Sequence, residues 1–363
     1  MSSEIGKRIH ISLFGESHGP AIGVTIDGLP AGEVLDWSGV EEQMVRRAPG
    51  RDKSSTPRKE RDSFEVLSGV YGDKTTGAPL CAIIRNEAMR SGDYAPFARM
   101  PRPSHADYPA AVRYNGHQDV RGGGHFSGRL TAPLVFAGAV CRQILYRREI
   151  VIGGHVRAVG GTADEALDPV AVSMEQLLSL SKQYFPVLSA EAGEKMRLEI
   201  EETRLAGDSI GGIVEVAAVG LPAGLGSPIF DGVENVLSAL LFGIPAVKGV
   251  EFGDGFFAAT QRGSRHNDPY SLDGAGRVVT ETNRHGGILG GITTGMPLLV
   301  RAAIKPTPSI ALPQKSVDLS EKKEAELRIE GRHDPCIVPR AVPAAEAAVA
   351  VGLLELWMEG GRA

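Results

Sequence analysis

Apolar and polar residues alternate along some stretches of the chain and recur at helical spacing along others, which predicts a mixture of strands and helices. The expected strands are 8–14, 22–26, 63–71, 80–85, 151–159, 213–219, 247–252 and 297–304. The expected helices are 37–47, 106–114, 127–146, 173–182, 190–206, 233–242 and 344–358. No linker-like break and no fixed-period repeat divides this series. We therefore expect a single domain, residues 1–363, of the α/β or α+β class.

Two of the expected helices lack a polar face. Residues 134–145 are apolar almost all round, and 344–358 carry only two charged side chains. A helix of this kind is usually buried on more than one side, so we infer helices sandwiched between sheets. Pro343 and Gly360 are predicted to begin and end the second of them. By contrast, 190–206 is rich in Glu, Lys and Arg and is typical of a surface or interface helix.

The composition is that of a soluble globular protein with a sizeable core, at 363 residues with 42% hydrophobic and 23% charged residues. A net charge of -5 argues against a nucleic-acid partner, which would require a basic surface. Cys81, Cys141 and Cys336 are far apart, which disfavours a disulfide framework or a zinc module and suits a reducing cytoplasm. The most apolar segment, 344–358, is shorter than the roughly 20 residues that cross a bilayer, so no membrane association is expected.

Gly15-Glu16-Ser17-His18-Gly19 is the most informative short segment. It lies between two expected strands, so an acid, a hydroxyl and an imidazole stand side by side in a glycine-flanked turn. Such a turn lets both the backbone and titratable side chains approach a ligand closely.

A second candidate segment is the cationic stretch 46–61, which Pro49-Gly50 and Thr56-Pro57 mark as a loop after a helix. It contains seven basic residues: Arg46, Arg47, Arg51, Lys53, Arg58, Lys59 and Arg61. The loop is either a solvated surface segment or a flexible lid that gathers a polyanionic ligand. Guanidinium groups suit carboxylates and phosphates because their paired donors match those oxygens.

A third segment, 122–129, runs from three glycines into an expected helix, with Ser127 as a good N-cap. Backbone N–H groups of such a turn form an anion site, although capping without a ligand explains the pattern equally well. The segment is neither a P-loop nor a dinucleotide-binding fingerprint.

The histidines and the late turns add further candidates. His18 and His105 each lie in a turn beside polar partners, whereas a lone histidine is more often structural. No HxxxH or HExxH spacing occurs, so no metal site is expected. Residues 305–309 form either a plain strand exit or a rigid rail for a phosphate chain. Asp334 either initiates a turn before Pro335 or takes part in the reaction.

Together these segments resemble the chorismate synthase family. Its three signatures correspond to Gly15–Pro30, Gly124–Ala137 and Arg332–Glu346. Further agreement comes from Arg46-Arg47, 102–108, 246–251, 286–291 and 305–309, so the resemblance covers about residues 6–358. Several motifs in the family's order are much more specific than any one of them.

The resemblance implies a β-α-β sandwich, in which antiparallel sheets enclose central helices, and a homotetramer. It also implies the anti-1,4-elimination of phosphate from 5-enolpyruvylshikimate 3-phosphate to give chorismate. The implied cofactor is reduced FMN, with NADPH as a possible reductant in some members. The rival interpretations are another FMN-dependent oxidoreductase that handles phosphate and a flavin- or anion-binding scaffold without activity.

The resemblance further implies roles for individual residues. His18 would protonate the leaving phosphate, His105 would stabilise the reduced flavin, and Asp334 would form a polar relay at the flavin N5. Two serines, Ser17 and Ser127, would complete this catalytic group. The substrate anions would be bound by Arg47, Lys53, Arg102 and Arg129. FMN would be lined by His125, Phe126, Ser127, Ala246, Gly290, Lys305, Pro306, Thr307, Pro308, Ser309 and Arg332.

Three positions depart from the usual family pattern. Ser104 stands where a glycine is usual and is expected to disturb the turn beside His105. Pro245 replaces an asparagine of some members, which removes a possible flavin hydrogen bond. Lys53 replaces an arginine and so offers a point charge in place of a bidentate clamp.

Overall fold

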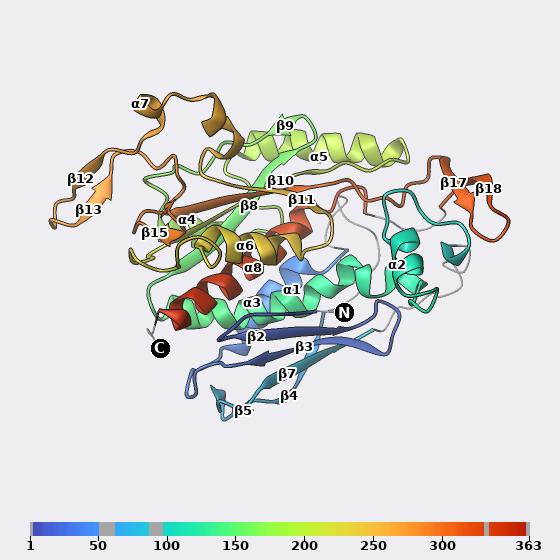
Figure 1. Cartoon of the computed structure of the whole chain (residues 1–363), viewed down its shortest axis with the longest axis horizontal. Coiled ribbons are helices and arrows are strands. Elements are labelled where there is room, and N and C mark those ends of the chain that lie inside the picture. The colour runs from blue at the N-terminus through green and yellow to red at the C-terminus, as the bar shows by residue number, and fades with distance from the viewer. Residues whose placement is uncertain (1–2, 51–61, 87–96, 330–333, 361–363) are drawn as a thin grey trace.

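Two five-stranded antiparallel sheets enclose a layer of helices (Figure 1). The structure is a computed structural model, and it describes residues 3–50, 62–86, 97–329 and 334–360. The sandwich inferred from the two apolar helices and implied by the resemblance is therefore confirmed.

The first sheet follows the alternating apolar pattern near the N-terminus. Ile22, Val24 and Ile26 point toward the helices and are almost fully buried, because successive side chains of a strand point to opposite faces. Its strand order is β1 (Glu4–Ile5), β2 (His10–Gly15), β3 (Ala21–Asp27), β7 (Leu80–Arg85) and β4 (Phe64–Ser68).

The second sheet is covered on both faces near its centre. The central helices pack on one face, and α4 (Met174–Leu180) packs on the other through a small apolar cluster around Leu177. Buried residues therefore run almost continuously along its two inner strands. The strand order is β11 (Val247–Phe252), β16 (Leu298–Ile304), β10 (Gly212–Val219), β8 (Val151–Val159) and β9 (Thr162–Ala163).

The helical layer is built on close contact between two nearly all-apolar helices, α3 and α8. Gly138 of α3 faces Ala347 of α8 so closely that a Cβ built on the glycine would lie 2.2 Å from the alanine Cβ. The lack of a side chain at Gly138 is what lets the two backbones approach. The layer comprises α1 (Trp37–Arg47), α3 (Thr131–Tyr146), α6 (Val233–Phe242) and α8 (Val338–Glu359).

The predicted start of α8 was wrong. The helix begins at Val338, with Pro339 in its first turn, and Pro343 lies inside it. Pro343 lacks the N–H that would bond the carbonyl four residues earlier, but burial of the surrounding apolar residues keeps the segment helical. With 22 residues, α8 is long and apolar enough to cross a membrane. However, 89% of its apolar window is buried inside the protein, so α8 is a core helix.

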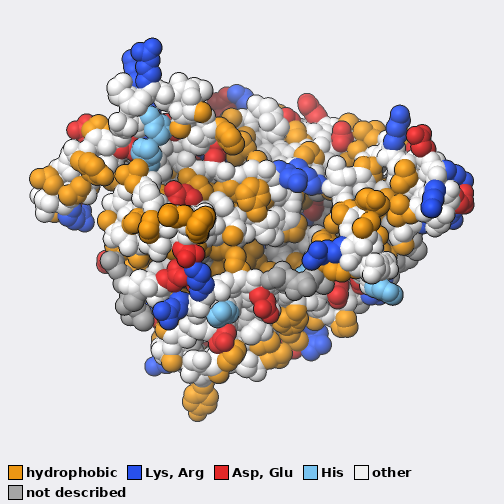
Figure 2. Space-filling view, viewed as in Figure 1, with side chains coloured by type: hydrophobic (Ala, Val, Ile, Leu, Met, Phe, Trp, Pro, Cys, Tyr) orange, Lys and Arg blue, Asp and Glu red, His pale blue; other side chains and the backbone are white. Residues whose placement is uncertain are grey.

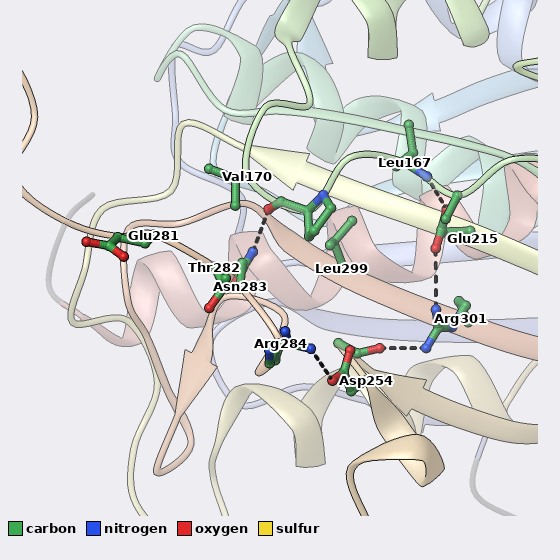
Figure 3. A pocket seen from close by; sticks show the side chains of 13 residues that line it. Leu167, Val170, Glu215, Asp254, Glu281, Thr282, Asn283, Arg284, Leu299 and Arg301 are labelled. Atoms are coloured by element: carbon green, nitrogen blue, oxygen red, sulfur yellow. Dashed lines mark hydrogen bonds and ion pairs between the residues drawn. The ribbon is translucent and has the colours of Figure 1, made fainter. Parts of the chain in front are cut away.

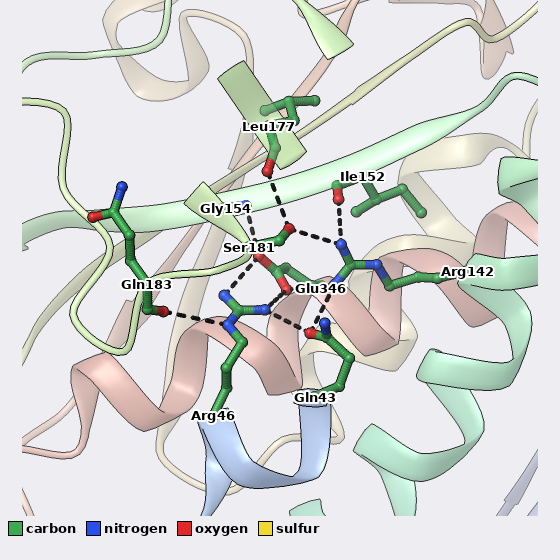
Figure 4. A network of polar contacts seen from close by, with 9 residues as sticks. All are labelled: Gln43, Arg46, Arg142, Ile152, Gly154, Leu177, Ser181, Gln183 and Glu346. Atoms are coloured by element: carbon green, nitrogen blue, oxygen red, sulfur yellow. Dashed lines mark hydrogen bonds and ion pairs between the residues drawn. The ribbon is translucent and has the colours of Figure 1, made fainter. Parts of the chain in front are cut away.

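A buried ionic cluster joins the helical layer to the second sheet (Figure 4). Glu346 of α8 is completely buried and accepts hydrogen bonds from Arg46 of α1, from Arg142 of α3 and from the backbone N–H of Gly154 in β8. The guanidinium groups oppose the effect of burial and lower the pKa of the Glu346 carboxyl. The Glu346 carboxylate thus links α8 to α1, α3 and β8.

The remaining elements lie at the periphery. The helix α5 (Ala190–Leu205) exposes most of its charged face, as expected for 190–206. The predicted strand 63–71 divides into β4 and the short β5 (Val70–Tyr71). The other short elements are β6 (Lys74–Thr75), α2 (Asp107–Arg113), α7 (Gly263–His266), β12 (Tyr270–Leu272), β13 (Val278–Thr280), β14 (Ile288–Leu289), β15 (Ile292–Thr293), β17 (Gln314–Asp318) and β18 (Lys323–Leu327).

Candidate active site

A cavity of about 840 Å³ opens at one end of the helical layer. Its wall combines the N-terminal turns, the start of α3, the connection from α6 to β11 and the segment after β16. The volume lies in the upper part of the range that holds small ligands and cofactors. Segments widely separated in the sequence therefore meet around one space.

The glycine turn before α3 shapes one side of this cavity. Gly122, Gly123 and Gly124 all have left-handed φ values, of 60°, 84° and 54°. The backbone N–H of Ser17 donates to the carbonyl of Gly124 at 3.1 Å, which fastens the turn at residues 15–19 to the glycine turn. A Cβ on Gly122 would lie 2.7 Å from Nε2 of His18, so this glycine lets the imidazole reach the cavity wall.

His105 is held by a buried ion pair. Nη2 and Nε of Arg102 donate to the two carboxylate oxygens of Asp107, each at 2.8 Å. Nδ1 of His105 lies 2.6 Å from Oδ1 of Asp107 and 3.1 Å from Nη2 of Arg102, so this side of the ring is held by the ion pair and Nε2 is directed toward Gly123 and the cavity. Burial raises the pKa of the Asp107 carboxyl, but hydrogen bonds from Arg102 and His105 outweigh it and lower the pKa well below its usual range.

Asp334 also lines the cavity, just before α8. Its carboxylate pairs with Arg340, and its backbone carbonyl accepts a hydrogen bond from the Thr307 hydroxyl at 2.9 Å. Nε of Arg340 also donates to the carbonyl of Arg47 at 3.0 Å. Asp334 is thereby anchored to both α1 and the segment after β16.

Ser127 and His125 have specific local partners. Oγ of Ser127 accepts from the N–H of Arg129 at 3.2 Å and caps the helical turn that leads into α3. Nδ1 of His125 donates to the carbonyl of Gly15 at 2.8 Å, and its Nε2 accepts from the Ser3 hydroxyl at 2.7 Å. With both ring nitrogens engaged, His125 fastens the glycine turn to β2.

Two buried arginines that line the cavity share one carboxylate. Nε of Arg47 lies 3.0 Å from Oδ2 of Asp62, and Nη1 of Arg129 pairs with Oδ1 of the same residue. The side chains of Arg47 and Arg129 are only 2% and 5% exposed. This pair is a source of positive charge with little surrounding water to screen it.

Two lysines that line the cavity, Lys248 and Lys305, add positive charge. Burial first, and then the neighbouring Lys248, lower the pKa of the Lys305 ammonium. Within the described residues, neither lysine has a carboxylate ion-pair partner. A phosphate at this position would relieve the repulsion between the two lysines.

The structure brings most of the predicted site residues together. Those lining the cavity are Ser17, Arg47, Arg102, His105, His125, Phe126, Ser127, Arg129, Ala246, Lys305, Thr307, Pro308, Ser309 and Asp334. His18 lies directly behind Gly122, while Pro306 and Gly290 do not line the cavity. Lys53 and Arg332, and with them the proposed lid over 51–61, lie outside the described residues.

Several supporting residues were missed by the sequence analysis. Asp62 and Asn86 each bond a predicted site residue, yet no motif marks them. Arg340 pairs with Asp334 and lies within the signature 332–346, but it was not among the predicted site residues. Asp107 follows His105 by two residues, and its pairing with Arg102 and His105 was likewise not predicted. Only the fold brings Asp62 and Asn86 near Arg129, so spacing along the sequence carried no signal for these two.

A second, smaller cavity of about 300 Å³ is lined by residues of β10 and β16 and by those that follow β11 (Figure 3). Its charged groups largely satisfy one another, since Arg301 lies near Glu215 and Arg284 near Asp254. None of the predicted site residues lines it. The larger cavity is therefore the candidate active site.

The fold and the site together define an enzyme that handles a polyanion. A cavity bordered by two histidines and several buried arginines and lysines is suited to binding phosphate and carboxylate groups and to transferring protons to them.

Comparison with known proteins identifies the family. A sequence profile described as chorismate synthase matches residues 9–358. A chorismate synthase of Thermococcus kodakarensis is 49% identical over 345 residues, covering 95% of this chain and 94% of the relative. One of Pyrococcus abyssi is 47% identical over 350 residues, covering 96% of each. A crystal structure titled as chorismate synthase superposes with a TM-score of 0.76 at 28% identity, covering 98% of this chain and 93% of the other.

The chain belongs to the chorismate synthase family. It is accordingly a phosphate-eliminating lyase that converts 5-enolpyruvylshikimate 3-phosphate to chorismate in the shikimate pathway.

Proposed function

We propose that the 840 Å³ cavity holds 5-enolpyruvylshikimate 3-phosphate against reduced FMN and that the residues lining it carry out the elimination. The observation that carries this proposal is that His105 and the Arg47–Arg129 pair line one space, with His18 packed directly behind Gly122 of its wall. The substrate has two carboxylates and a phosphate, so a cavity rich in guanidinium groups matches its charge.

The residues present suit FMN. Lys305 and Lys248 are placed to receive its phosphate, and 305–309 supplies hydroxyl groups along an extended segment stiffened by two prolines. Phe126 and Ala246 offer apolar surface to a flavin ring. When bound, reduced FMN supplies electron density to the substrate ring and a nitrogen that accepts the ring hydrogen as a proton.

The two histidines serve different groups. His18, whose imidazole packs against Gly122 of the cavity wall, donates a proton to the departing phosphate. His105, whose Nδ1 is engaged by Asp107, turns Nε2 toward the reduced flavin and stabilises its charge. Asp334, with Ser17 and Ser127, provides the polar relay that removes the proton from the flavin side of the cavity.

Substrate anions bind to Arg47, Arg102 and Arg129, with Lys53 contributing from the segment outside the described residues. Arg129→Ala is expected to raise the substrate KM. Unchanged substrate affinity in this variant would remove Arg129 from the anion site.

The test is an anaerobic assay with chemically reduced FMN, in which phosphate and chorismate are measured together. We expect stoichiometric release of both without net oxidation of FMN, whereas stoichiometric flavin oxidation would support the oxidoreductase alternative. His18→Ala and His105→Ala should each lose about 10²–10⁴-fold in rate while FMN still binds. Near-normal turnover in either variant contradicts its assigned role. Repeating the assay with NADPH and oxidised FMN tests whether the chain reduces its own flavin.

We also propose that the chain is one domain that assembles as a homotetramer in the cytoplasm. The shared helical layer supports one domain, and three free cysteines suit a reducing compartment. Figure 2 shows apolar side chains over the β12–β13 hairpin, where Tyr270, Leu272 and Val278 are each more than 60% exposed. Large exposed apolar patches mark association surfaces. Light scattering of the purified chain measures the assembly state, and a monomer would contradict the proposal.

A further inference from the structure

Two buried polar residues lie opposite each other where strands of the first sheet meet the cavity. Phe64 of β4 pairs with Ile84 of β7, so Asp62 and Asn86 occupy the next opposed positions beyond the ends of these strands. The backbone N–H of Asn86 continues the sheet by donating to the Pro20 carbonyl at 3.2 Å. Asp62 and Asn86 are 5% and 7% exposed, so a rigid sheet edge fixes both side chains.

Asp62 holds the two cavity arginines side by side. Its carboxylate pairs through one oxygen with Arg47 and through the other with Arg129. The arrangement is reinforced by a hydrogen bond from Nη1 of Arg47 to the carbonyl of Arg129 at 3.4 Å. Two buried guanidinium groups repel each other, so an anion between them is needed to keep both near the substrate site when no substrate is bound.

Asn86 connects Arg129 to the turn that carries His18. Its Oδ1 accepts from Nε of Arg129 at 3.2 Å, and its Nδ2 donates to the carbonyls of Glu16 and Gly19, at 3.0 and 2.8 Å. The amide therefore bonds an anion-binding residue on one side and both ends of the segment around His18 on the other. A single side chain sets the distance between the proton donor and the arginine.

We propose that Asp62 and Asn86 are positioning residues of the elimination. Asp62 fixes the spacing of the Arg47–Arg129 pair, and Asn86 aligns Arg129 with His18. Neither residue lines the cavity, so both act through the groups that do. This inference rests on the proposed roles of His18 and the arginines. Its test distinguishes a failure of the positioning roles from a failure of the proposed function.

The first experiment is a double-mutant cycle on kcat/KM for 5-enolpyruvylshikimate 3-phosphate, with the full chain and reduced FMN. Asp62→Asn preserves the shape of the side chain and removes its charge. We expect it to lower kcat/KM by about 10–100-fold, since small misplacements of substrate-binding groups have effects of this size. If Asp62 acts through Arg129, then Asp62→Asn in an Arg129→Ala background should lower kcat/KM much less than in the wild type.

The second experiment tests Asn86 and does not depend on the folding of the Asp62 variant. Asn86→Ala should couple both to Arg129→Ala and to His18→Ala, because its amide bonds the surroundings of each. Glu65→Gln is the matched control: Glu65 lies on β4 near Asp62, but it forms an exposed pair with Arg85 and should leave kcat/KM unchanged.

The outcomes distinguish the inference from the proposed function. A wild-type chain without elimination activity would overturn both. If the wild type is active, multiplicative losses in all three cycles, or single variants with normal kcat/KM, would overturn the positioning roles alone. Melting temperatures of all variants show whether a loss of activity reflects unfolding.

Discussion

At the scale of single residues, the site depends on positions where a side chain would occupy space already taken. Gly122 has a left-handed backbone, and a Cβ there would lie 2.5 Å from Cδ2 of His18 and 2.8 Å from Oγ of Ser17. Glycine satisfies both requirements at once, since it adopts positive φ easily and carries no Cβ. The packing of His18 is therefore set by a residue that takes no part in the chemistry.

Gly122→Ala should displace His18 and Ser17 and lower kcat by about 10²-fold or more, because a shift near 1 Å at a reacting group has an effect of that order. Turnover with reduced FMN is the measurement. Gly161→Ala is the matched control, since that glycine lacks a positive φ and a Cβ there meets nothing within 4 Å. Equal activity of the two variants would contradict the steric argument.

Ser104 has a strained backbone conformation beside a predicted catalytic residue. It adopts a left-handed φ of 58° immediately before His105, a conformation that disfavours residues with a Cβ. Ser104→Gly should relieve this strain and raise the free energy of unfolding by about 0.5 kcal/mol, after allowance for the greater freedom of glycine in the unfolded chain. Chemical denaturation measures the change. Asn115→Gly, at φ 50°, should gain less because asparagine tolerates this conformation better.

At the scale of elements, a buried histidine links the strands of the second sheet. The imidazole of His155 on β8 lies between the carboxylates of Asp164 and Glu215, at 3.2 and 2.9 Å. Burial opposes protonation, but the hydrogen bonds that the imidazole donates to Asp164 and Glu215 outweigh it and raise the pKa of His155. The same contacts lower the pKa of both carboxyls, against the opposing effect of their burial.

This cluster predicts a pH window of stability. The raised His155 pKa adds stability that is fully present below its ordinary value of 6.5 and is lost as pH rises through the folded value. The lowered carboxyl pKa values add stability that is present above 3.8 for Asp164 and 4.5 for Glu215 and is lost as pH falls. The contribution is therefore greatest between these values and 6.5.

His155→Gln should destabilise the chain by about 3–5 kcal/mol near pH 6, since it removes the cation between two buried carboxylates and leaves Glu215 only the more distant Arg301, at 3.8 Å. The difference from the wild type should shrink as pH rises above the folded pKa of His155. Denaturation midpoints measured across pH 5–9 check this, with the exposed His117→Gln as control. A difference that does not vary with pH would contradict the assigned charge on His155.

The sequence predicted the elements best where the burial pattern is periodic. The apolar run in α3 and the alternation in β3 identified a buried helix and an inward-facing strand. The start of α8 was missed because Pro343 was interpreted as a first-turn proline, whereas packing on all sides keeps it inside the helix. The hairpin β17–β18 was not predicted, because its short polar strands lack a clear apolar alternation.

The sequence predicted only part of the candidate site. Motifs identified His18, His105 and the arginines, but Asp62 and Asn86 have no motif and meet their partners only after β4 and β7 pair. Tertiary ion pairs of this kind leave no periodic trace in a single sequence.

At the scale of the whole molecule, the contact between α3 and α8 sets the spacing of the two sheets. Gly138→Ala would place a methyl group 2.3 Å from Cα of Ala347, so the two backbones would have to separate. We expect the free energy of unfolding to fall by about 1–3 kcal/mol. Because α3 begins at the cavity wall, kcat should fall as well. Denaturation and turnover measure both effects, and an unchanged stability would contradict the inferred closeness of the helices.

Arg46 and Arg47 are neighbours in the sequence, but they pair with different carboxylates. In α1 their side chains diverge by roughly a quarter turn, so one enters the Glu346 cluster and the other reaches Asp62 at the cavity. An insertion or deletion of one residue upstream within this helix would rotate both away from their carboxylates and disrupt core and catalysis together. The Glu346 cluster and the Asp62 pair at the cavity thus both constrain the length of α1. Natural insertions and deletions should accumulate in the loops beyond this helix.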